Sequence, residues 1–347
     1  MNRTSLSMVI LVGLVVAACN SSGQTATTIA ESSTTSSIKD QPTTSTETLP
    51  PASTTVPIVD LNGRIVFTRA GGVFGDETIF TANADGTAER QLTDYGDSCC
   101  VRISRDGTRV LYSALAPDGQ RITTAIQDLA SGAVSLIPLP DDTANLGPGV
   151  WSPDGERIAV QLWDESDPSR DGIYTVLAID GSDLSRVTDA DIADIPGDYA
   201  PDGTKLVIFR ESSTQSVGVV FIVDISGNGD PVRITPEGML VGFGSVRYVP
   251  DGSRILFNEG RTSPTGALWT VQPEGTDLRK VFEDAQGRFA SHPAWSPDGS
   301  MIMFALNPIA DDFQHRPNGL YVIDADGSNL RLVVGGDDFK REPEWFE

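Results

Sequence analysis

The chain has 347 residues and a formal net charge of −23 at pH 7. The excess of acidic residues lies after residue 57, in the part of the chain that is expected to fold. A surface of this sign repels phosphate backbones and anionic lipid, which excludes a nucleic-acid partner and favours a well-solvated surface.

Residues 1–18 are predicted to be a signal peptide. Arg3 provides a positive charge, and residues 6–18 (LSMVILVGLVVAA) are apolar but shorter than the ~20 residues of a transmembrane helix. The stretch leads into Cys19 through Val16-Ala17-Ala18, which resembles a bacterial lipobox. In such signals the cysteine becomes the first residue and is diacylated, and two acyl chains give a stable anchor. We therefore expect an extracytoplasmic lipoprotein whose lipid anchor at Cys19 inserts in the cell membrane. An ordinary secretory signal is the alternative.

Residues 19–57 are predicted to be the lipidated cysteine followed by a disordered tether. Of the 38 residues from Asn20 to Pro57, half are Ser or Thr and none is aromatic. Such a segment buries too little apolar surface to offset the entropy lost on ordering. It would hold the following domain away from the membrane.

Residues 58–347 are predicted to form one repeat domain. Five segments share an Asp-Gly turn followed by a hydrophobic strand, and WSPDG occurs unchanged at 151–155 and 295–299. The aligned aspartates are spaced by 48, 48, 49 and 47 residues; they are Asp106, Asp154, Asp202, Asp251 and Asp298. Each turn and a second hairpin about 25 residues later give four antiparallel strands per repeat, the pattern of a β-propeller blade.

The two ends of this domain complete each other. Residues 342–347 (EPEWFE) match the start of a repeat, and residues 62–70 (NGRIVFTRA) match the strand that follows such a start. Together they give one shared blade, which leaves no open sheet edge. The prediction is an all-β, six-bladed β-propeller closed by its N- and C-terminal strands.

The repeat resembles that of the TolB-like, or WD40-like, propeller family. The likeness rests on WSPDG with its hydrophobic strand and on the later Asp-Gly turn with its Leu/Val-Thr strand, and it extends over all six repeats. The resemblance implies a propeller but not a single function. TolB carries an α/β domain before its propeller, whereas this chain has the Ser/Thr-rich segment there, so the resemblance does not imply a Tol–Pal role.

Catalytic motifs are not apparent. The sequence has no G-x-S-x-G or phosphate-binding loop, and its two histidines, His292 and His315, are too few for a three-histidine zinc site. DADGSN (324–329) lacks the ligand pattern of a calcium loop and is predicted to be a hairpin turn. We therefore expect neither an enzyme nor a cofactor, with a divalent cation in the channel as the alternative.

The repeated Asp-Gly turns are called the SPDG turns below. The candidate binding site is predicted at the channel mouth opposite these turns. Loops of variable length lie on that face, and variable loops on a regular scaffold often bind ligands. The residues one and three positions before each aligned aromatic position form a mixed polar ring there. With neighbours from the adjoining loops, the candidate residues are Cys99, Cys100, Arg102, Asp198, Arg247, His292, His315, Arg341, Glu342 and Glu344. Ordinary residues around a water-filled entrance are the alternative.

Cys99 and Cys100 are the only thiols left once Cys19 is lipidated. In an oxidising compartment they have two outcomes. They form a strained disulfide between adjacent residues, whose Cα atoms are about 3.8 Å apart, or they stay reduced or pair between molecules.

Three functions follow from these features. The first is a binding scaffold for an envelope protein, a small ligand or a glycan. The second is a metal-assisted hydrolase or lactonase-like enzyme that uses acidic residues at the channel mouth. The third is an accessory subunit of an envelope complex.

Overall fold

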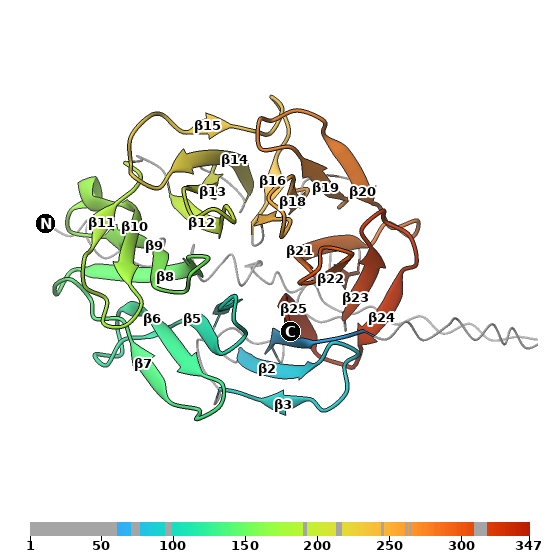
Figure 1. The fold of residues 1–347 in the computed structure, drawn as a ribbon, viewed down its shortest axis with the longest axis horizontal. Helices are drawn as coiled ribbons and strands as arrows, with labels where there is room; N and C mark the ends of the chain where they lie inside the picture. The colour runs from blue at the N-terminus through green and yellow to red at the C-terminus, as the bar shows by residue number, and fades with distance from the viewer. Residues whose placement is uncertain are drawn as a thin grey trace, which may run out of the picture.

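The computed structural model describes residues 61–347, apart from 71–76, 94–98, 190–192, 213–216, 244–245, 261–262, 264 and 309–317. Six antiparallel sheets stand around a central axis, as Figure 1 shows in a view along that axis. The predicted all-β, six-bladed propeller is therefore confirmed. Cys19 and the predicted tether lie outside the described residues.

Each blade is a sheet of four main strands, numbered here from the channel outward. Blade 1 comprises β25 (Phe339–Phe346), β1 (Arg64–Ala70), β2 (Thr78–Asn83) and β3 (Arg90–Gln91). Blade 2 comprises β4 (Cys99–Ile103), β5 (Arg109–Leu115), β6 (Ile122–Asp128) and β7 (Val134–Leu136). Blade 3 comprises β8 (Ala144–Trp151), β9 (Arg157–Asp164), β10 (Gly172–Leu177) and β11 (Ser185–Arg186).

The remaining blades follow the same order. Blade 4 comprises β12 (Asp194–Tyr199), β13 (Lys205–Glu211), β14 (Val217–Asp224) and β15 (Val232–Arg233), with β16 (Val241–Gly242) paired to β14. Blade 5 comprises β17 (Arg247–Tyr248), β18 (Ile255–Asn258), β19 (Leu268–Val271) and β20 (Arg279–Phe282). Blade 6 comprises β21 (Phe289–Trp295), β22 (Met301–Asn307), β23 (Gly319–Asp324) and β24 (Arg331–Val334).

The ring closes where the sequence predicts. β25 pairs antiparallel with β1, with Trp345 opposite Ile65 and Phe346 opposite Arg64. The Trp345 indole N–H also donates to the Asn62 carbonyl at 2.9 Å. The C-terminal strand is therefore the inner strand of a blade whose other strands come from the start of the domain.

The SPDG turns are built by their own side chains. In the third blade the Asp154 carboxylate accepts hydrogen bonds from the Ser152 hydroxyl at 2.6 Å and from the Glu156 N–H at 3.0 Å. Gly155 has φ +69°, a left-handed conformation that favours glycine. Asp298 makes the same pair of contacts with Ser296 and Ser300 in the sixth blade. The repeated motif therefore serves to reverse the chain between the first and second strands of a blade.

The hydrophobic core is divided among the blade interfaces. Within the described residues, six larger clusters each join two neighbouring blades. Trp345 belongs to the cluster between blades 6 and 1, and Phe346 to the cluster between blades 1 and 2. One short 3-10 helix, Pro168–Arg170, interrupts the strands. Across the ranges given above, no helix has the length and apolar character needed to cross a membrane.

Candidate functional site

A cavity of about 410 Å³ opens on the face that carries the SPDG turns. We call it the funnel. Its wall is made of the turns and the aligned aromatic positions of successive blades: Ser104, Arg105, Trp151, Pro153, Tyr199, Pro201, Tyr248, Pro250, Trp295, Pro297 and Trp345. The sequence placed the binding site at the opposite mouth, whereas this cavity is surrounded by the repeated motif itself.

The floor of the funnel is a cluster of four charged side chains from four blades. Arg247 donates to the Glu344 carboxylate at 2.6 Å, and Arg102 lies 3.6 Å from the same carboxylate oxygen. Arg247 also donates to the Gly197 carbonyl at 2.9 Å, and the Asp198 carboxylate accepts from the Tyr248 N–H at 3.0 Å. These four residues were candidates from the sequence, and the structure brings them together across the axis.

Burial changes the protonation of this floor. Loss of solvent raises the pKa of Asp198 to about 6, although the positive charge of Arg247 opposes the shift. Burial also lowers the pKa of Arg102, with the Arg247 charge acting in the same direction. As the pH rises through about 6, Asp198 therefore loses its proton and the funnel floor gains one negative charge.

A second layer lies behind the floor, three positions before the position that Trp or Tyr occupies in most blades and Ile103 occupies in blade 2. Cys100, His292 and Glu342 have φ values of 65°, 51° and 54°, and they come from blades 2, 6 and 1, which are neighbours in the ring. Each lies where the inner strand shifts register against the next strand. All three are buried. The same backbone bulge in three blades therefore places three chemically different side chains at equivalent positions.

Contacts in this layer centre on Glu342. Its Oε2 accepts from the Cys100 N–H at 2.6 Å and from the Thr68 hydroxyl at 3.2 Å. Burial raises the pKa of Glu342, but nearby positive charges, led by Arg341, outweigh burial and leave it below its usual value. Cys100 and Glu342 also line a small cavity of about 20 Å³, enough for one water molecule.

The other candidates have separate surroundings. The His292 ring Nδ1 is 3.1 Å from the Ser291 hydroxyl, its Nε2 is buried without a hydrogen-bond partner, and burial lowers its pKa to about 4. Arg341 pairs with Glu77 at 2.7 Å in its own blade. His315 lies outside the described residues. The side chains that the described ranges contain include no group of three His, Cys, Asp or Glu residues suited to a metal ion.

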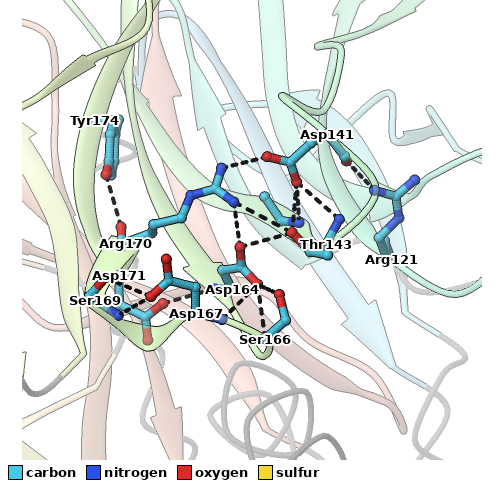
Figure 2. A network of polar contacts seen from close by, with 11 residues as sticks. Arg121, Asp141, Thr143, Asp164, Ser166, Asp167, Ser169, Arg170, Asp171 and Tyr174 are labelled. Carbon is cyan, nitrogen blue, oxygen red and sulfur yellow. Dashed lines mark hydrogen bonds and ion pairs between the residues drawn. The ribbon is translucent and has the colours of Figure 1, made fainter.

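A polar network at the opposite face holds the loop between β9 and β10 (Figure 2). The buried Asp164 carboxylate accepts from the Ser166 N–H and from Thr143, and Arg170 bridges Asp164 and Asp141. The sequence predicts loops of variable length on this face but does not predict the bonding within this one. Since one Asp164 carboxylate oxygen is bound by Ser166 in the loop and the other by Thr143 before β8, we interpret the network as a brace that joins the loop to the segment entering blade 3.

Sequence reasoning also missed the funnel wall and a neighbouring cavity. The aromatic and proline residues of the wall are the repeated positions, which the sequence identified only as architecture. A further cavity of about 400 Å³ lies beside the funnel, between Leu61–Gly63 and the turn at Ser296–Asp298. The repeat does carry one signal for the funnel. Because the SPDG turns of all blades lie on one face, they form a rim around the axis.

Comparison with known proteins agrees with this architecture. An uncharacterized protein of Agrobacterium fabrum is 28% identical over 202 residues, which cover 56% of this chain and 64% of the relative. An oligogalacturonide lyase of Pectobacterium atrosepticum is 26% identical over 106 residues, 30% of this chain and 27% of the lyase. These alignments therefore cover less than two thirds of either relative.

A solved structure and a family model extend the match. The crystal structure of TolB from Acinetobacter baumannii aligns with a TM-score of 0.63 and 20% identity, covering 82% of this chain and 67% of that one. At this identity the alignment shows the fold alone. The family model of the TolB beta propeller domain (PD40) matches residues 60–347, which span the whole described range. The chain therefore belongs to the TolB beta-propeller domain family.

Proposed function

We propose that this protein is an extracytoplasmic lipoprotein, anchored through Cys19, whose propeller binds an extended segment of an envelope protein in the funnel. The signal-like segment, the Cys19 lipobox and the Ser/Thr-rich stretch support the location. The observation that carries the binding role is the funnel itself, a cavity of about 410 Å³ with a buried ionic floor. A volume of this size is typical of ligand sites.

The chemistry of the funnel favours a polypeptide. Arg247 and Glu344 place donors and acceptors side by side on the floor, which suits the alternating N–H and C=O groups of an extended chain. Proline and aromatic side chains on the wall provide apolar contact for its side chains. The strongly negative protein favours a neutral or basic segment over an acidic one.

The side chains of the funnel floor also favour binding over metal-assisted catalysis. The metal-assisted enzyme considered from the sequence requires several acidic or histidine ligands that converge on one point. The described ranges hold no such group, and the Glu344 carboxylate of the floor is engaged with Arg102 and Arg247. The partial likeness to oligogalacturonide lyase does not add the missing ligands.

Site-specific photo-crosslinking in the native envelope tests the binding role. Arg105 is exposed at the funnel wall, and Val134 is exposed on β7 at the outer edge of the same blade. A photoreactive residue in place of Arg105 should form an adduct with a discrete protein, and the same residue in place of Val134 should not. Equal labelling from both positions, or a missing adduct at Arg105, would contradict the proposal.

A further inference from the structure

Two adjacent thiols meet inside the propeller. Cys99 and Cys100 begin β4, and their sulfur atoms are 2.8 Å apart with both residues in the thiol form. This separation exceeds the ~2.05 Å of a disulfide bond and is shorter than an ordinary non-bonded contact between two sulfur atoms. The reduced protein therefore holds both sulfur atoms ready to be joined.

The backbone, rather than the cysteines, sets this arrangement. Cys100 has φ +65°, and the equivalent residues His292 and Glu342 in neighbouring blades have the same left-handed conformation without any thiol. The Cys100 N–H is also fixed by its 2.6 Å bond to the Glu342 carboxylate. The fold therefore maintains the local conformation of the pair whether or not the sulfur atoms are bonded.

The surroundings suit thiol–disulfide exchange with a small reagent. The thiolate is the attacking species in such exchange, and the buried Arg102 guanidinium interacts electrostatically with Cys100. Cys99 is 8% exposed and Cys100 is 5% exposed. These small fractions favour a low-molecular-weight disulfide over an oxidising protein, and they oppose pairing between two copies of the chain.

We propose that Cys99 and Cys100 form a reversible redox pair, which closes an intramolecular disulfide by exchange with a small disulfide such as oxidised glutathione. One cysteine thiolate attacks a glutathione sulfur, which forms a mixed disulfide and releases one glutathione thiolate. The second cysteine, as thiolate, attacks the first cysteine's sulfur and releases the other glutathione. The protein loses two electrons and two protons, and the small disulfide becomes two thiols.

Adjacency makes this bond a switch rather than a permanent crosslink. Neighbouring Cα atoms are about 3.80 Å apart, whereas most disulfides join Cα atoms at about 4.4–6.8 Å. Strained disulfides are more easily reduced and belong to the labile or regulatory group. The inference stands on the cysteine geometry and does not depend on what the funnel binds.

Redox titration of the full-length chain with Cys19→Ala tests the pair, because this variant keeps Cys99 and Cys100 as its two cysteines. The protein is equilibrated at a series of oxidised and reduced glutathione concentrations, acid-quenched, treated with N-ethylmaleimide and weighed by intact mass spectrometry. We expect a monomer two hydrogens lighter that carries no maleimide. The ratio of this disulfide form to the doubly labelled thiol form should rise tenfold for each tenfold rise in the concentration of oxidised glutathione divided by the square of the concentration of reduced glutathione. The same ratio should be reached from the oxidised and from the reduced protein.

Single-cysteine variants provide the matched control. Cys99→Ser and Cys100→Ser in the same background should each stop at one glutathione per chain, because the second thiol is missing. Three results for the two-cysteine chain would overturn the proposal. They are two free thiols at every ratio, a persistent glutathione adduct or disulfide-linked dimer, and a disulfide that reduced glutathione cannot open.

Discussion

At the scale of single residues, the funnel floor shows how burial and pairing act on one carboxylate. Asp198 is partly buried, lies near Arg247 and accepts from the Tyr248 N–H, yet its pKa rises to about 6 because loss of solvent is the largest effect. Its neighbour Glu344 is held by an arginine at 2.6 Å. The two acids of the floor therefore have different surroundings, and burial makes Asp198 take up a proton in mildly acidic solution.

This asymmetry predicts a pH-dependent effect of Asp198→Asn. Between about pH 4 and 6 the folded protein keeps the Asp198 proton while the unfolded chain has lost it, so the wild type loses stability as the pH rises. The variant lacks this effect. Its free energy of unfolding relative to wild type should therefore increase from pH 4 to pH 6 and then level off, by about 2 kcal/mol after allowance for solvent screening.

Urea unfolding at several pH values measures this difference. Asp142→Ala is a suitable control because Asp142 is exposed and carries no hydrogen bond among those found in the structure. A stability difference for Asp198→Asn that stays constant from pH 4 to pH 7 would show that Asp198 ionises normally.

At the scale of the element, the SPDG hairpin depends on one side chain per turn. Asp154 accepts from a hydroxyl and a backbone N–H, which lowers its pKa. Asp154→Ala should lower the melting temperature by about 2–4 °C, because the turn loses about 1 kcal/mol of hydrogen bonding. Asp298→Ala should act alike, since its contacts are the same. The stabilisation is fully present above the unfolded pKa of about 4 and is lost as the pH falls through the lower pKa of the folded protein, so the difference between variant and wild type should shrink in that range.

Differential scanning fluorimetry at pH 7 and pH 3 checks this prediction, again with Asp142→Ala as the control. An unchanged melting temperature for both aspartate variants at pH 7 would mean that the glycine and proline of the motif make the turn alone.

The elements also show what the sequence could and could not predict. Strand order and turn positions follow from the 47–49-residue spacing, because the repeated turns leave room for only one arrangement of four strands. The ring positions of Arg102, Arg247 and Glu344 could be predicted too. Their contacts could not, because residue spacing gives a place on an inner strand but not the direction of a long side chain.

Backbone bulges explain a second limit. Cys100, His292 and Glu342 share a left-handed conformation that their residue types do not signal, since such φ values ordinarily mark glycine. The internal repeat predicts that these residues are equivalent, but it predicts them at the open mouth of the channel. The structure buries them behind the charged floor. The face on which the cavity opens depends on how wall side chains pack around the axis, which a repeat pattern does not contain.

At the scale of the whole molecule, stability depends on closing the ring. β25 places Trp345 and Phe346 in the clusters on either side of blade 1. Removing residues 337–347 would expose both clusters and leave β1 without its inner partner. We expect this truncation to abolish the cooperative thermal transition, because each buried aromatic side chain contributes about 2–3 kcal/mol and two blade interfaces open together.

Circular dichroism during heating measures the loss. Removal of Glu347 alone, an exposed residue outside β25, should leave the transition intact. A cooperative transition that survives the longer truncation would show that five complete blades are stable without closure.

Closure also fixes where the chain enters the propeller. Leu61 and Asn62 lead into β1 beside Trp345, and with Gly63 they line the cavity next to the SPDG turn of blade 6. The polypeptide that precedes the domain therefore joins it at the rim of the funnel. If Cys19 anchors the protein as proposed, the tether would attach on the side of the propeller where the funnel opens. A ligand that enters the funnel would then pass close to the point where the tether joins the propeller.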